Sequence, residues 1–270
     1  MPILLIVARA FWKEAKKIKN KYVIIIKYMA TGMLVNSVVC LAIFVASLLT
    51  SYSILNKKDK SRADISFAGF WFFTSIVWIL MSISLVFCQR EMWQNDLLLN
   101  KYGVQTFIFA QIVAGSYYAF FRVFRNDRIA ILGFFSYIIL TTVALFSVYS
   151  KGGIVLSQKS FFSVEYRLNP VTWHIFQIIF SVGILCLVYD IVRLIAISVK
   201  AGKLKGAKYL FAGFSIILYG IFGYFDMQGI TTQWTIVLYR IGVATAAIIA
   251  YLAYNGGPII EDFKGVFKAS

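Results

Sequence analysis

The sequence predicts an all-α integral membrane protein, a seven-transmembrane-helix bundle preceded by a basic amphipathic N-terminal helix. Three observations predict this class. Hydrophobic residues make up 60% of the 270 residues and charged residues only 14%, whereas a soluble domain carries about a quarter of charged residues. The apolar residues form blocks of roughly 20 residues, enough to cross about 30 Å of hydrocarbon. Basic residues outnumber acidic ones by 27 to 11 and gather between the blocks.

The first expected element lies within residues 1–29, an interfacial N-terminal segment. Its stretch Ala10–Lys21 combines many lysines with apolar residues at helical spacing. Such a basic amphipathic helix lies in the plane of the membrane surface. It does not resemble a secretory signal peptide, because its charges follow the short apolar start and no small-residue cleavage site comes after a proper apolar core.

Residues 30–256 form the expected seven-helix domain. Each apolar block is predicted to be a helix, because lipid offers backbone groups no hydrogen-bond partner. The expected spans are Ala30–Leu55, Ser66–Cys88, Val104–Phe124, Ile129–Ser150, Thr172–Val199, Tyr209–Met227 and Thr235–Tyr254. The longest expected loop is Lys151–Val171, in which Pro170 suits the first turn of the following helix. Residues 257–270 are expected to be a short tail.

The distribution of lysine and arginine predicts the orientation of the chain. The loops after the first, third and fifth spans and the tail, counted together with Arg122 and Arg193 near the ends of their spans, contain fourteen basic residues, and the opposite loops contain five. This excess places the C-terminus in the cytoplasm of a protein of the cell membrane. Seven further basic residues precede the first span and oppose this assignment, so the side of the N-terminus stays open.

A charged side chain inside a span is costly, so Asp226 and Arg240 are the first candidates for a functional site. Asp226 ends the sixth span, and Arg240 lies about two turns into the seventh. A short loop joins these spans, so we expect the two residues to form an intramembrane ion pair. Such a pair serves either as a staple of the helix hairpin or as a switch that contacts a ligand.

His174 and Trp173 lie near the outer start of the fifth span. A histidine there can contact a ligand or respond to pH, or it can simply be solvated beside an anchoring tryptophan. Small residues also recur at helical spacing and predict close helix packing. They are Gly213, Gly220 and Gly223 in the sixth span, and Gly242, Ala246 and Ala250 in the seventh.

Several motifs are missing from the sequence. It contains no GxxxxGK[ST] phosphate loop, HExxH or GxSxG, so we expect no catalysis in this chain. One histidine and three separated cysteines provide no metal-ligand spacing, and no cofactor is expected. The net charge of +16 fits contact with anionic lipid better than nucleic acid in so apolar a chain. The expected partners are the lipid bilayer and another protein, with a homo-oligomer left open.

The second half resembles the membrane part of prokaryotic seven-helix sensors. The stretch AKYLFAGFSIILYGIFGYFDMQGI, followed by WTIVLYRIGVATAAIIAYLAY, combines a Gly-rich helix with an acidic end, a short turn and an Arg-bearing helix. The resemblance implies a receptor that relays a signal by helix rearrangement. Since the sequence ends at Ser270 without an output domain, we expect a separate partner to receive the signal.

The first half resembles ABC-2 type transporter permeases, which carry a basic amphipathic helix before the first span and a coupling helix after the second. The coupling segment would be QREMWQNDLLLNKYGVQ, beginning with Arg90, Glu91, Met92 and Trp93. This resemblance implies an exporter subunit that works with a separate ATPase. The glycine, threonine and glutamate usual in that segment are replaced here. A third alternative is an accessory subunit of a membrane complex.

Overall fold

The computed structural model describes residues 32–89, 92–124, 127–159, 164–201, 206–227 and 233–256. Within them, seven helices are long and apolar enough to span a membrane, which confirms the predicted number of long apolar helices. They are a first helix at Gly32–Leu55, α2 (Arg62–Gln89), α4 (Gln105–Val123), α5 (Asp127–Tyr149), α6 (Pro170–Lys200), α7 (Ala207–Met227) and α8 (Gln233–Asn255). The predicted amphipathic helix and the tail lie outside the described residues.

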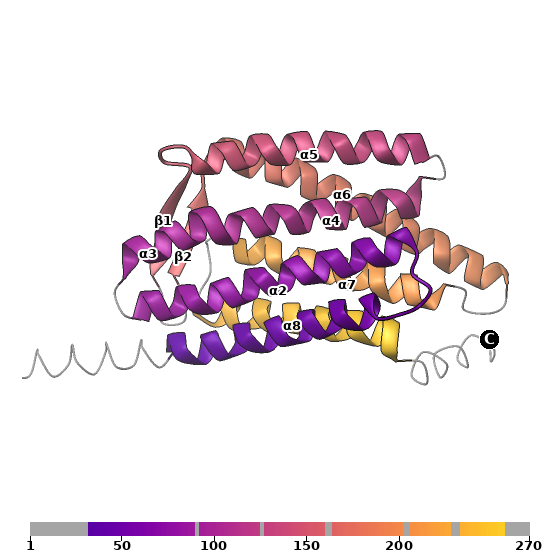
Figure 1. Cartoon of the computed structure of the whole chain (residues 1–270), viewed down its shortest axis with the longest axis horizontal. Helices are drawn as coiled ribbons and strands as arrows, with labels where there is room; N and C mark the ends of the chain where they lie inside the picture. The colour runs from indigo at the N-terminus through magenta and orange to yellow at the C-terminus, as the bar shows by residue number, and fades with distance from the viewer. Residues whose placement is uncertain are drawn as a thin grey trace, which may run out of the picture.

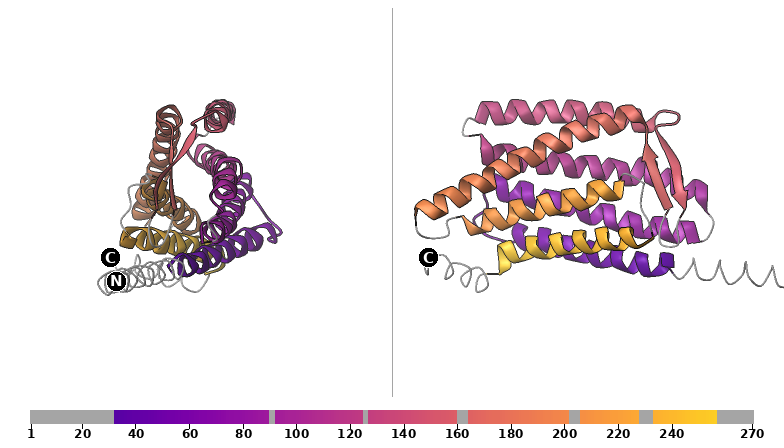
Figure 2. Two further views of the ribbon diagram at one scale, coloured as in Figure 1. Left: turned by 90° about the vertical axis from the view of Figure 1, so that its left-hand side faces the viewer. Right: turned by 180° about the vertical axis from the view of Figure 1, so that it is seen from behind.

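The seven helices lie along a common axis, and successive helices run in opposite directions (Figures 1 and 2). One end contains the starts of α2, α5 and α7 and the ends of α4, α6 and α8. We call it the basic end, because Arg62, Arg122, Arg128, Lys200 and Lys208 lie there. The opposite end contains a pair of strands and is called the hairpin end.

The third span begins earlier than predicted. The sequence predicted Val104–Phe124, but the apolar helix covers Trp93–Val123. It consists of α3 (Trp93–Leu98), a π-helical stretch η1 (Leu99–Val104) and α4 in direct succession. Polar residues such as Asp96 and Asn100 suggested a loop, yet both side chains are buried, with 0% and 4% of their surface exposed.

A β-hairpin occupies the predicted loop, so the expectation of an all-α fold is wrong in this detail. Strands β1 (Ile154–Lys159) and β2 (Val164–Leu168) pair antiparallel, with a register irregularity between Leu156 and Gln158. Ile154 and Leu168 are buried against the ends of the helices. The hairpin leads into α6, where the Asn169 side chain caps the helix and proline occupies the first turn, as predicted.

The Asp96 carboxyl group fastens the hairpin to the bundle. One oxygen accepts hydrogen bonds from Ser84 of α2 and from Asn100, the latter at 3.1 Å. The other accepts from Tyr166 of β2 and from the Cys88 thiol at 3.0 Å. Burial, followed by the hydrogen bond to Asp96, raises the pKa of the Tyr166 hydroxyl. This network joins α2, α3, η1 and β2.

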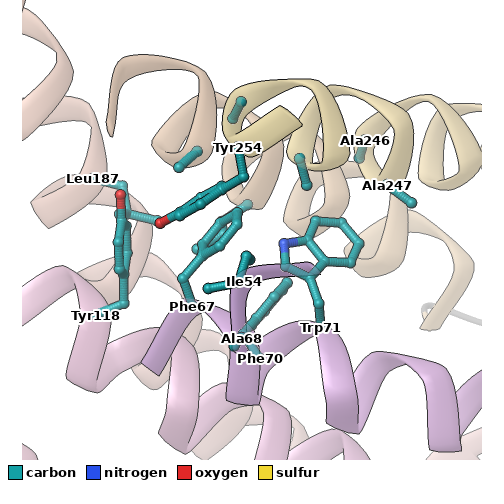
Figure 3. Close-up of a cluster of buried hydrophobic side chains, with 14 of the residues drawn as sticks. Ile54, Phe67, Ala68, Phe70, Trp71, Tyr118, Leu187, Ala246, Ala247 and Tyr254 are labelled. Carbon is teal, nitrogen blue, oxygen red and sulfur yellow. The ribbon is translucent and has the colours of Figure 1, made fainter. Parts of the chain in front are cut away.

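The largest hydrophobic core cluster lies toward the basic end. Phe67 of α2 stacks on Tyr254 of α8, with 5.2 Å between ring centroids, and packs on Tyr118 of α4 (Figure 3). Ala246 and Ala247 are fully buried in the same cluster, so α8 contributes small side chains where α2 contributes aromatic rings. Large and small residues therefore interdigitate across this interface.

We predict that Tyr166→Phe lowers the free energy of unfolding in detergent by about 1–2 kcal/mol, because one Asp96 oxygen loses a buried donor. The matched control is Tyr102→Phe, since Tyr102 of η1 is 49% exposed. Thermal or denaturant unfolding of both purified variants tests the prediction. Equal stability of the two variants would show that the Tyr166–Asp96 bond does not hold the hairpin.

Candidate functional site: a cavity inside the bundle

A cavity of about 160 Å³ lies inside the bundle. Its lining comes from α2, η1, α4, α5, β2, α6, α7 and α8, so almost every element contributes to it. Along α4 the lining extends from Gln105 to Ser116, which corresponds to about 17 Å at 1.5 Å per residue. A cavity of roughly 150 Å³ holds a molecule the size of benzene, so this one has room for a small ligand.

Several polar side chains in the wall at the middle of the cavity are hydrogen-bonded to one another. Gln111 of α4 donates to Thr74 of α2 at 2.7 Å, and its carbonyl accepts from Tyr219 of α7 at 3.4 Å. The Tyr219 hydroxyl also accepts from the Trp78 indole at 3.3 Å. These hydrogen bonds connect α2, α4 and α7 at the cavity wall. A bound molecule that displaces one of these side chains therefore shifts the contacts among all three helices.

Two buried oxygen atoms in the lining accept no hydrogen bond from the described residues. They are Oε1 of Gln105, at the start of α4, and Oδ1 of Asp226, near the end of α7. Both positions lie toward the hairpin end of the bundle (Figure 1). Since buried polar atoms normally have partners, these two acceptors give the cavity a preference for a molecule that carries a hydrogen-bond donor.

Asp226 and Arg240, the predicted ion pair, both line this cavity. Arg240 is only 1% exposed and interacts electrostatically with Asp226. Its guanidinium also donates to the Cys40 thiol of the first helix at 3.3 Å and lies 5.7 Å from the Trp78 ring centroid. The arginine therefore connects α8 with the first helix, α2 and the cavity.

Stacked aromatic rings form another part of the wall. Tyr224 of α7 lies between Trp173 and Phe180 of α6, with centroid distances of 5.4 Å to each. Trp173 is half-buried in this stack, but it is not in the cavity lining. His174 is exposed, and its Nδ1 lies 3.2 Å from Oε1 of Gln177. The predicted contact of these two residues with a ligand stays a prediction.

The small residues lie where α7 and α8 contact their neighbours. A Cβ atom added at Gly220 would lie 2.8 Å from a Phe180 ring atom, and one added at Gly242 would lie 2.3 Å from the Phe222 ring. Gly220 also lines the cavity. A Cβ atom added at Gly213 would lie 3.4 Å from an Ile191 side-chain atom. One added at Gly223 would lie 3.8 Å from the Tyr219 ring. Ala246 and Ala250 are fully buried.

A cluster of charged side chains around Asp64 lies at the basic end. The sequence did not predict this cluster. The Asp64 carboxylate of α2 contacts the Lys208 ammonium of α7 at 2.6 Å and accepts from the Tyr254 hydroxyl of α8 at 2.7 Å. Lys57 donates to the Tyr254 carbonyl. Partial burial, followed by the charge of Lys208, lowers the pKa of the Lys57 ammonium group. These contacts join α2, α7 and α8.

A second ion pair connects the remaining helices at that end. Arg122 of α4 donates to the Asp190 carboxylate of α6 at 2.9 Å, and Arg193 lies 3.8 Å from the same carboxylate. The Arg122 guanidinium also packs 4.1 Å from the ring centroid of Tyr209 of α7. Charged contacts at the basic end therefore hold together five of the helices that line the cavity, namely α2, α4, α6, α7 and α8.

The predicted coupling segment is only partly described. Arg90 and Glu91 lie outside the described residues. Met92 precedes α3 and is exposed, and Trp93, the first residue of α3, packs against the cluster around Leu85. This segment continues directly into the third span and lies at the hairpin end, away from the basic end (Figure 1).

No metal site is formed by three or more His, Cys, Asp or Glu side chains within the described residues. The three cysteines form no disulfide; Cys40 and Cys88 are buried, and Cys186 is half-buried. Comparison of the chain with known protein families and with curated proteins finds no match.

We predict an energetic coupling between Asp226 and Arg240 in a double-mutant cycle with Asp226→Asn and Arg240→Gln. Arg240→Gln alone should lower the free energy of unfolding by about 3 kcal/mol, because it leaves a buried carboxylate without its counter-charge. The double variant should recover about 1–3 kcal/mol relative to the sum of the single effects. Additive effects of the two substitutions would show that the residues do not form an ion pair.

Proposed function

We propose that this chain is a seven-helix, receptor-like membrane protein that binds a small amphipathic ligand in the cavity. In this proposal it has no catalytic activity, and it relays the signal by helix rearrangement to a protein partner. The hairpin end faces the outside of the cell membrane, and the basic end, with the C-terminus, faces the cytoplasm. The excess of basic residues at that end supports this orientation.

One observation carries the proposal: five of the helices that line the cavity, α2, α4, α6, α7 and α8, are also joined by charged contacts at the basic end. Gln111, Asp226 and Arg240 line the cavity from α4, α7 and α8. The same helices contribute Arg122, Lys208 and Tyr254 to the charged contacts. Packed helices and ion pairs have discrete arrangements, so a helix shift at the cavity favours a different arrangement at the basic end.

The chemistry of the lining indicates the ligand class. Aromatic and aliphatic side chains form most of the wall, and the two acceptors without a donor, on Gln105 and Asp226, lie toward one end. A largely apolar molecule with a hydroxyl, amine or N–H group at one end matches both features. Binding energy would come from apolar contact, and selectivity would come from the acceptors.

The receptor proposal is favoured over an ABC-2-like permease for a structural reason. A coupling helix must contact an ATPase in the cytoplasm. Here the corresponding residues Trp93–Leu98 continue directly into the third span. They also lie at the end opposite the basic residues (Figure 2). An accessory subunit of a larger complex would not need the cavity.

We predict that indole stabilises the purified protein more than indene, its hydrocarbon analogue without the N–H donor. One hydrogen bond to a buried acceptor corresponds to about a fivefold to tenfold difference in affinity. At a given ligand concentration, a ligand that binds the folded state more tightly raises the unfolding temperature more. Thermal unfolding of the protein with each compound at the same concentrations therefore measures the preference.

The matched variants for this experiment are Gly223→Leu and Ser181→Leu. Gly223 lines the cavity, and an added Cβ has only ordinary contact at 3.8 Å, so leucine fills the cavity without a backbone clash. Ser181 is exposed on α6 and controls for detergent effects. Indole should stabilise wild type and Ser181→Leu but not Gly223→Leu. Equal stabilisation by both compounds, or an unchanged response of Gly223→Leu, would contradict the proposal.

A further inference from the structure

A second hollow, of about 600 Å³, lies on another part of the bundle and does not share residues with the central cavity. It runs along α4, which packs between α2 and α5 (Figure 1). Small residues of α4, including Ala110, Val113 and Ala114, line it together with larger side chains of α2 and α5, such as Ile65, Phe73, Phe134 and Ile138. This alternation of small and large residues makes an apolar groove.

Arg62 is the charged residue that lines this groove, at the basic end where α2 begins. Its side chain is exposed and forms no hydrogen bond or ion pair with the residues that the structure describes. Three nearby lysines differ from it, because Lys208 pairs with Asp64, and Lys57 and Lys60 donate to backbone carbonyls. Arg62 is therefore available to an external anion.

The length of the groove matches one leaflet of a bilayer. Along α2 it extends from Arg62 to Phe73, about 17 Å at 1.5 Å per residue. Half of a hydrocarbon core of about 30 Å is about 15 Å. A chain that lies in the groove thus reaches from the membrane surface, where Arg62 lies, to the middle of the bilayer.

We propose that the groove binds an anionic phospholipid of the leaflet at the basic end. One acyl chain lies along Ala110, Val113 and Ala114, and the phosphate-bearing headgroup lies at the Arg62 guanidinium. Charge complementarity selects the anionic headgroup, since one arginine near the surface contributes about 1 kcal/mol toward anionic lipid. The proposal depends on the groove and not on the ligand of the central cavity.

Native mass spectrometry of the full-length protein tests this proposal with dioleoyl-phosphatidylglycerol and dioleoyl-phosphatidylcholine, which share their chains and differ in net charge. Wild type should bind phosphatidylglycerol about fivefold more tightly, which is the contribution of one arginine. Arg62→Gln should abolish this preference. The control Lys58→Gln removes an exposed cation of the adjacent loop that does not line the groove, and it should retain the preference.

A second variant tests the position of the acyl chain. Thr142 is exposed on α5 and lines the groove, so Thr142→Trp fills the groove with little disturbance of the core. Binding of phosphatidylglycerol should fall several-fold in this variant. The proposal is overturned if Thr142→Trp binds the lipid as wild type does, or if Lys58→Gln and Arg62→Gln have equal effects. Competition by soluble glycerol phosphate would also overturn it, because the site would then recognise an anion without its chain.

Discussion

Hydrocarbon contains no water, so every polar group in the interior of this bundle has to find its partner within the chain or in a bound molecule. The described residues meet this constraint in three places. At the hairpin end, Asp96 accepts from Ser84, Cys88, Asn100 and Tyr166. In the middle, Gln111 connects three helices. At the basic end, ion pairs centred on Asp64 and Asp190 hold the helix ends together.

The cavity is one place where this constraint is not fully met; within the described residues, single buried atoms such as the Trp71 indole nitrogen and the Ser47 hydroxyl are others. Phe180 and Tyr224 stack on one another in the cavity wall, but Gln105 and Asp226 keep acceptors without donors. A structural bundle would gain stability by filling this space with apolar side chains. A cavity that keeps a few polar groups beside space for a small molecule is typical of a binding site. The proposed function therefore depends on the cavity and not on a surface feature.

The number of spans could be predicted from the sequence, because seven blocks of about 20 apolar residues have no other stable state in lipid. Asp226 and Arg240 could be singled out for the same reason. The extension of the third span could not, because Asp96 resembles a loop residue until Tyr166, which lies 70 positions away, is placed beside it. The Asp64–Lys208 pair escaped prediction likewise, since each residue lies just outside an expected span. The cavity depends on the packing of helices distant in sequence, which no single segment reveals.

The most direct test of the account is the sidedness of the two ends of the bundle. A cysteine at Gln94 of α3 and one at Lys200 of α6 both occupy exposed positions, at the hairpin end and the basic end respectively. In intact cells, an impermeant thiol reagent should modify Gln94→Cys, while Lys200→Cys should react only after the membrane is opened. Modification of Lys200→Cys in intact cells, with Gln94→Cys protected, would contradict the receptor topology and favour a permease.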